Sequence, residues 1–193
     1  MRQDHIVCMM PFADGYKLHS ESFRSIAQQT IDVHLMPITR PKDHFTFGKM
    51  PQVFVKKIRT ERKGISTCRN ILRELALELE DEFILHVDTD VVLASDHDVE
   101  DMLQFMEENP RVAVLGLNTK NFEVKKLDPP HIPMACLMFR RGILGQIIFH
   151  NSKYFRKCNC QMLCQDVRKI DHPDGGKWEV RYLDDRHLKE IGR

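Results

Sequence analysis

The sequence lacks a strong excess of charge and a long apolar segment. Its 193 residues carry 29 basic and 28 acidic side chains, which gives a formal net charge of +1. This balance gives no reason to expect bulk binding to nucleic acid or to an anionic membrane. No stretch reaches the roughly eighteen consecutive apolar residues of a transmembrane helix, and the start, MRQDHIVCMMPF, is interrupted too soon for a signal peptide. We therefore expect a cytoplasmic protein with no membrane span and no nucleic-acid partner.

Repeats, low-complexity segments and linkers are also absent, and the length suits one compact domain. Three of the six cysteines, Cys158, Cys160 and Cys164, could in principle bind zinc together with His172. However, C-x-C-x3-C is not a usual zinc spacing, and free thiols are the default in the cytoplasm. Reduced cysteines are therefore the favoured interpretation.

Short apolar runs alternate with segments of helical periodicity over the first 120 residues. We expect strands at 5–12, 31–39 and 111–119, a strand that starts at 83 and runs into the aspartates at 88 and 90, and helices at 16–30, 67–82 and 94–110. Ser66 is the expected N-cap of the second helix. Further on we expect strands at 53–58, 132–139 and 177–184, and the start of a helix at 140–149. The alternation predicts an α/β protein with a mainly parallel central sheet flanked by helices.

Two aspartates, Asp88 and Asp90, interrupt the apolar run FILHVDTDVVL. Carboxylates are costly to bury, and ligands of parallel sheets bind beyond the carboxyl ends of the strands. Side chains two apart in an extended segment leave the same face, so this pair could hold one divalent ion against a diphosphate. The alternative is a surface turn in which one acid caps the next helix.

The run KGISTCRNILRELALELEDEFILHVDTDVVL resembles the family-2 glycosyltransferases, which carry a glycine, a small-Arg-Asn step that opens a helix, and a strand ending in D-x-D. Upstream, IVCMMPFADG is similar to the family's first strand and nucleotide loop, and SFRSIAQQT to its S-x-x-x-Q-T helix end. Downstream, CQDVRK falls at its acidic motif and YLDDRH at its late histidine. The matches follow the family's order over nearly all of the chain.

The resemblance implies a single GT-A-like, Rossmann-like catalytic domain over 1–193, with a nucleotide-binding half at 1–120 and an acceptor and catalytic half at 121–193. It also implies a metal-dependent glycosyltransferase that uses Mn²⁺ or Mg²⁺. The sugar would move from a nucleotide-diphosphate-sugar donor, most often a UDP-sugar and possibly a GDP-sugar, to a hydroxyl of a glycan or other acceptor, with inversion.

By resemblance, Asp90 would be the direct metal ligand, and Asp88 would reach the ribose or the ion through water. Thr89 would lie against the sugar nucleotide mainly through its backbone. His187 would complete the metal shell, and neutral imidazole suits manganese better than magnesium. Without the motif order, a late histidine is more often a surface residue.

Asp166 would be the general base that takes the acceptor proton, although Gln165 stands where the family usually has an acid. The alternative for Asp166 is an ordinary polar residue at a helix start. Arg69 would contact the donor nucleotide, and its alternative is a surface arginine paired with Glu74. Lys63 is a weaker nucleotide-binding candidate.

The resemblance places the base beside Pro11, Phe12 and Ala13. The family usually ends its second strand with an aspartate that reads the base, whereas this chain has PITRP. Either Thr39 or Arg40 serves there, or the base is held differently. The nucleotide identity therefore does not carry over.

Two other functions stay open. A sugar-phosphate nucleotidyltransferase would normally show a Gly-rich loop with Arg or Lys after the first strand, which MPFADGYKLHS lacks. A non-catalytic sugar- or nucleotide-binding domain on a decayed transferase scaffold is favoured by Gln165 and by the altered end of the second strand.

Overall fold

A computed structural model describes residues 5–11, 20–39, 53–55, 58–59, 64–119, 132–151 and 158–190. Its strands are β1 (His5–Met10), β2 (Asp32–Thr39), β3 (Val53–Val55), β4 (Ile58–Arg59), β5 (Phe83–Val87), β6 (Val91–Val92), β7 (Val112–Thr119), β8 (Cys136–Arg140) and β9 (Glu179–Glu190). Its helices are α1 (Ser20–Ala27), α2 (Ile65–Leu77), α3 (Asp98–Glu108), α4 (Arg141–Leu144) and α5 (Asn159–Val167).

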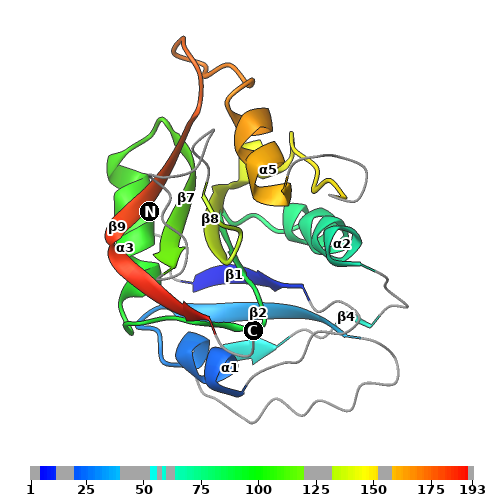
Figure 1. Cartoon of the computed structure of the whole chain (residues 1–193), viewed down its shortest axis with the longest axis vertical. Helices are drawn as coiled ribbons and strands as arrows, with labels where there is room; N and C mark the ends of the chain where they lie inside the picture. The colour runs from blue at the N-terminus through cyan, green and yellow to red at the C-terminus, as the bar shows by residue number, and fades with distance from the viewer. Residues whose placement is uncertain are drawn as a thin grey trace.

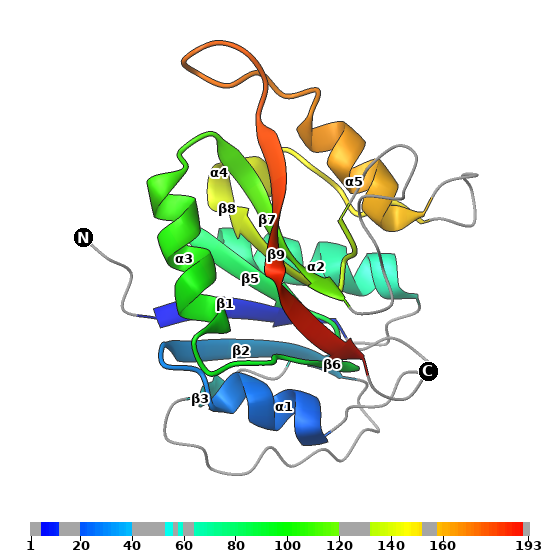
Figure 2. The same ribbon diagram turned by 60° about the vertical axis from the view of Figure 1, so that its left-hand side comes forward.

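The strands form one sheet in the order β3-β2-β1-β5-β8-β7-β9-β6, with β4 also beside β2 (Figure 1 and Figure 2). Strand β1 pairs in parallel with β2 and β5, β2 with β3 and β4, and β7 with β9. The antiparallel pairs involve β8, which lies between β5 and β7, and β6, which pairs with β9. The predicted α/β class with a mainly parallel sheet is confirmed.

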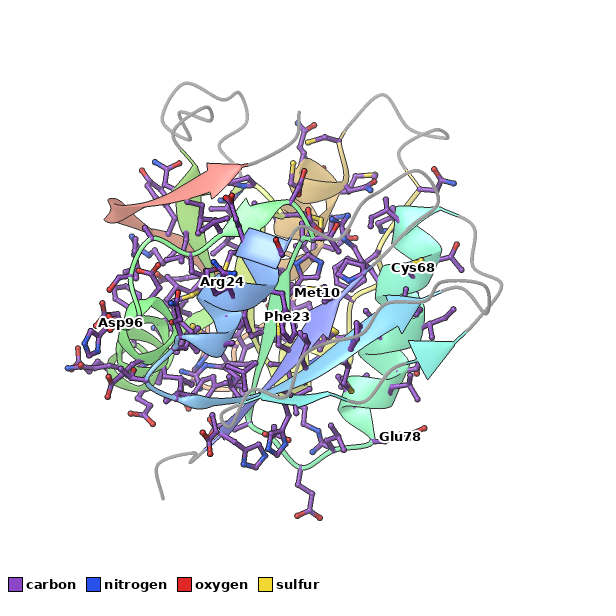
Figure 3. All side chains as sticks on the ribbon, turned by 90° about the horizontal axis from the view of Figure 1, so that it is seen from below. Met10, Phe23, Arg24, Cys68, Glu78 and Asp96 are labelled. Carbon is purple, nitrogen blue, oxygen red and sulfur yellow. The ribbon has the colours of Figure 1, made fainter. Side chains whose placement is uncertain are left out.

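Helices cover both faces of the sheet, with α1 and α3 on one face and α2, α4 and α5 on the other (Figure 2). Successive side chains of a strand point to opposite faces, which divides the core in two. Val7 and Met9 of β1 pack in the same cluster as Cys68 of α2. Met10 packs in the other cluster with Phe23 of α1, and the two lie together near the centre of Figure 3. Among the described residues, no helix is both long and apolar enough to cross a membrane.

Several predicted boundaries differ from the structure. The helix predicted at 140–149 is limited to the single turn of α4. Ser66 is not the N-cap of α2, because the helix begins earlier with Gly64 as its N-cap, at a φ of 80° that favours glycine. The Ser66 hydroxyl instead donates to the His150 carbonyl oxygen over 2.7 Å.

Gln29 links α1 to the segment that leads into α3. Its amide nitrogen donates to the carbonyls of Ser25 (3.0 Å) and Ser95 (2.8 Å), and its amide oxygen accepts from Val99 N (3.0 Å). Val99 lies in the first turn of α3, where backbone N–H groups have no partner within the helix. The His97 side chain makes no cap bond, so the buried Gln29 supplies the cap from another element. This explains the glutamine of the S-x-x-x-Q-T motif.

We predict that Gln29→Ala lowers the free energy of unfolding by about 2–4 kcal/mol, because Val99 N and Ser95 O lose a buried partner. Urea denaturation followed by circular dichroism measures the change. Gln28→Ala is the matched control, since Gln28 is exposed and a surface substitution shifts stability by roughly 0.5 kcal/mol or less. Equal midpoints for the two variants would contradict this role.

Candidate active site

Asp88, Thr89 and Asp90 form a turn at the carboxyl end of β5. The strand ends at Val87, Asp88 N donates to Ala135 O (2.9 Å), and Val91 N donates back to Asp88 O (3.2 Å). The strand predicted to run into the aspartate pair is confirmed as β5, but the pair lies in the turn that follows it and not in an extended segment. Asp90 is 8% exposed and Thr89 1%, so this turn is largely buried.

Arg69 of α2 holds the Asp88 carboxylate. Its Nη2 donates to Oδ1 over 2.8 Å and to Oδ2 over 3.1 Å. Side chains of β5 alternate between the two faces of the sheet, and Ile84 packs on the face covered by α2. Asp88, four residues further on, comes out on the same face as Ile84, where Arg69 of α2 reaches it. The alternative pairing of Arg69 with Glu74 is wrong, because Glu74 pairs with Arg73. The Arg69 side chain is 6% exposed and that of Asp88 16%, so the ion pair is partly buried.

His86 completes a cluster of three side chains with Arg69 and Asp88. It is fully buried, and Arg69 Nε donates to His86 Nε2 over 3.1 Å. Burial, and then the adjacent Arg69 charge, hold the pKa of His86 well below its ordinary value, so the imidazole is neutral. His86 was not predicted as a site residue, although its position two residues before Asp88 places both side chains on the same face of the chain.

The first turns of α2 also hold the segment that precedes residue 151. Asn70 exchanges two hydrogen bonds with the Phe149 backbone, one from Asn70 Nδ2 to Phe149 O (2.9 Å) and one from Phe149 N to Asn70 Oδ1 (2.8 Å). The Ser66 hydroxyl binds the next carbonyl, that of His150. The Arg-Asn step of the motif thus serves two partners, since Arg69 holds an aspartate and Asn70 holds a neighbouring chain segment.

Asp166 receives two hydrogen bonds near the end of α5. His150 Nε2 lies 2.7 Å from Asp166 Oδ2, and Lys169 Nζ donates to Oδ1 over 2.8 Å. Partial burial opposes ionisation, but the bonds from Lys169 and His150 outweigh it and hold the pKa of Asp166 below its ordinary value. Asp166 is the eighth of nine residues in α5, so the helix-start alternative is wrong. Through His150, this carboxylate is connected to the start of α2.

His187 lies inside β9, which runs to Glu190, and the predicted end of the last strand at residue 184 is wrong. The parallel pairing with β7 sets His187 opposite Asn118, and the antiparallel pairing with β6 sets Lys189 opposite Val92. The strand that carries His187 therefore runs beside the strand that follows Asp90. The His187 side chain itself lies outside the described part of the chain. Among the side chains that are described, no group of three His, Cys, Asp or Glu could hold a metal ion.

Comparison of the sequence finds no matching protein-family model and no curated protein that matches significantly. The structure, in contrast, matches solved glycosyltransferases. S. aureus TarS in complex with UDP-GlcNAc aligns with 98% of this chain and 60% of its own at 16% identity, with a TM-score of 0.65. The mannosyltransferase PcManGT from Pyrobaculum calidifontis, in complex with GDP-Man and Mn²⁺, aligns with 98% of this chain and 57% of its own at 11% identity, with a TM-score of 0.68.

A third match is the glucosyl-3-phosphoglycerate synthase from Mycobacterium tuberculosis in complex with Mn²⁺ and UDP-Glc. It covers 98% of this chain and 72% of its own at 10% identity, with a TM-score of 0.65. The chain has a GT-A-like fold. It spans about 60% of the TarS chain and 57% of the mannosyltransferase chain that it matches.

The GT-A-like sheet brings further predicted residues to the edge that carries Asp88. Pro11 is buried directly after β1, and Thr39 is the last residue of β2. Because β1 lies in parallel between β2 and β5, the carboxyl ends of these three strands share one edge. The side chain of Thr39, and the residues Phe12, Ala13 and Lys63 as a whole, lie outside the described part of the chain.

The six cysteines all lie in the described part of the chain, and none of them forms a disulfide. Cys158 Sγ lies 2.7 Å from Cys160 Sγ at the start of α5. The His172 ring lies against Trp178, with 4.3 Å between ring centroids, and His172 Nδ1 accepts from Asp174 N. The structure thus gives His172 other partners than the three cysteines.

A cavity of about 790 Å³ lies at the opposite end of β5, beside residues that include Glu82, Arg140 and Trp178. Arg140 is already bound there, since its Nε donates to Val112 O and its Nη1 to Glu82. None of the predicted site residues lines this cavity. The candidate active site of the GT-A-like fold is therefore the edge with Asp88 and Asp90.

We predict that Asp166 stabilises the protein at neutral pH and that acid removes this contribution. A carboxyl with a lowered folded-state pKa stabilises above its unfolded pKa, which is about 3.9, and the effect disappears as the pH falls through the folded value. The urea midpoint of Asp166→Asn should lie below that of the wild type at neutral pH, and the gap should narrow as the pH falls below about 3.9.

The control is Asp96→Asn, which removes an exposed acid and should leave the midpoint unchanged at each pH. A gap for Asp166→Asn that persists undiminished to pH 3 would contradict the assignment.

Proposed function

We propose that this protein is a metal-dependent glycosyltransferase that moves a sugar from a nucleotide-diphosphate-sugar donor to a hydroxyl acceptor with inversion. The observation that carries the proposal is the turn of Asp88, Thr89 and Asp90 at the carboxyl edge of a GT-A-like sheet, with Arg69 fixed on Asp88. UDP-GlcNAc, GDP-Man and UDP-Glc are the donors in the matched complexes, and they define the first donors to test.

The donor set of the turn fits Mn²⁺ or Mg²⁺, because both ions take carboxylate oxygens. Both Asp88 oxygens already accept from Arg69, which supports Asp90 as the direct ligand and Asp88 as a contact through water or to the ribose. His187, in the strand beside β6, would be a further ligand that suits manganese. When bound, the ion would offset the negative charge of the departing diphosphate.

Asp166 would act as the general base of the transfer. The acceptor hydroxyl oxygen attacks the anomeric carbon on the face opposite the diphosphate, the carbon–diphosphate bond breaks, and the hydroxyl proton passes to the carboxylate. The lowered pKa keeps Asp166 ionised at neutral pH but makes it a weaker base. Proton transfer then depends on the positive charge that the attacking oxygen gains as its new bond forms.

Thr89 would contact the donor through its backbone, since its side chain is buried. Pro11, Phe12, Ala13 and Thr39 would surround the base, and Lys63 would contact the nucleotide. The nucleotide-binding half would extend over 1–120 and the acceptor and catalytic half over 121–193. We propose a cytoplasmic location and a glycan or similar acceptor.

Nucleotidyl transfer is the second candidate, and one structural match favours it. A putative glucose-1-phosphate thymidylyltransferase from Bacillus anthracis aligns with 96% of this chain and 88% of its own at 9% identity, with a TM-score of 0.57. The absence of a Gly-rich, basic loop after β1 in the sequence weighs against this function.

Calorimetry with UDP-GlcNAc, UDP-Glc and GDP-Man tests the proposal, with Mn²⁺ and again with a chelator. We expect at least one donor to bind with Mn²⁺ and to lose affinity without it. Asp90→Asn should weaken that binding by roughly tenfold or more, which corresponds to about 1.4 kcal/mol, without changing the far-ultraviolet circular dichroism. Asp166→Asn should bind the donor normally but fail to transfer the labelled sugar.

The matched control for Asp90→Asn is again Asp96→Asn, an exposed acid a few residues further along the chain. Absence of binding by every donor would refute the proposal. Donor binding without transfer by the wild type would favour the non-catalytic alternative, and release of pyrophosphate from a nucleoside triphosphate and a sugar phosphate would favour nucleotidyl transfer.

A further inference from the structure

We infer that His86 is a positioning residue of the proposed donor site, which holds the Arg69 guanidinium in the plane that keeps Nη2 on Asp88. The contacts among His86, Arg69 and Asp88 are those of the structure. Their effect on donor binding rests on the proposed function. His86 is not one of the motif positions, which are the glycine, the small-Arg-Asn step and the D-x-D pair.

The direction of the hydrogen bond fixes the chemical form of the ring. A guanidinium only donates hydrogen bonds, so His86 Nε2, 3.1 Å from Arg69 Nε, must accept through its lone pair. An imidazolium would place two donors against each other. His86 is therefore the neutral tautomer with its proton on Nδ1.

Two anchors fix a planar group better than one. With Nη2 alone on the carboxylate, the guanidinium could swing about Asp88, but the second bond from Nε to His86 removes that freedom. Asp88 also accepts the hydrogen bond that closes the turn, from Val91 N to its carbonyl oxygen. The orientation of Arg69 thus bears on the turn that presents Asp90.

His86 is itself held rigidly from several sides. In β5 it lies opposite Met9 of β1 and opposite Leu137 of β8. Its ring stacks beside Phe149, with centroids 6.3 Å apart and planes 27° apart, and Asn70 holds the Phe149 backbone. An acceptor on a buried, doubly paired strand is a fixed reference point for the arginine.

A role in packing alone makes a different prediction. Phenylalanine has a ring of similar shape and would satisfy the apolar surroundings, but it offers no acceptor to Arg69 Nε. Glutamine packs less well, but its side-chain carbonyl oxygen can accept at about the position of Nε2. The pair of substitutions therefore separates hydrogen bonding from packing.

The experiment measures UDP affinity with Mn²⁺ by calorimetry for the wild type, His86→Phe and His86→Gln. We expect His86→Phe to weaken binding about tenfold and His86→Gln to restore it to within roughly threefold of the wild type. His97→Phe is the control, because His97 is exposed and should leave the affinity unchanged. Equal affinity of His86→Phe and the wild type would overturn the inference, as would a His86→Gln variant as weak as His86→Phe.

A second measurement is independent of donor binding and of how the variants fold. Nitrogen NMR of the wild-type imidazole should show the Nδ1–H tautomer, and the Arg69 Nε–H signal should exchange slowly with water. An Nε2–H tautomer or a rapidly exchanging Arg69 Nε–H would overturn the inference. If the wild type binds GDP instead of UDP, the affinity comparison is made with GDP. If it binds neither, the proposed function fails, and this measurement alone decides whether His86 positions Arg69.

Discussion

The partly buried ion pair between Arg69 and Asp88 joins the start of α2 to the carboxyl end of β5, and the candidate site depends on it. Removing either partner would leave the other charge uncompensated where little water reaches it. The ion pair also gives the two aspartates different roles in the proposed site. Both Asp88 oxygens accept hydrogen bonds from Arg69, and Asp88 closes the turn in which Asp90 lies. In the proposed function, Asp90 is the direct metal ligand.

The same helix connects the two ends of the proposed chemistry. From its first turns, Arg69 reaches the aspartate turn, while Ser66 and Asn70 hold the backbone of Phe149 and His150. The His150 ring then meets Asp166 on α5. A shift of α2 along its axis would disturb the donor side and the base side together. This coupling gives a physical reason for the small-Arg-Asn step at the start of the helix.

Local patterns predicted much of the fold, because apolar runs and helical stripes depend on neighbouring residues. The predicted bounds of β2 and β7 differ from the observed bounds by one residue at the start of each strand. The aspartate pair was also correctly placed at the end of a strand. Local patterns could not give the contacts of Ser66 and Asn70, whose partners lie 84 and 79 residues away. The extension of β9 to Glu190 was missed because its last residues are mostly charged. The sequence spacing alone places His86 on the same face as Asp88. That His86 accepts a hydrogen bond from Arg69 could be known only from the position of α2 in the structure.

The central claim is that Arg69 stays on Asp88 while Asp90 binds the ion. A crystal structure of the protein with UDP and Mn²⁺ tests it most directly. The account predicts an Asp90 carboxylate oxygen within bonding distance of the manganese and the Arg69 Nη2 bond to Asp88 intact. A manganese ion without contact to Asp90, or an Arg69 side chain turned away from Asp88, would contradict it.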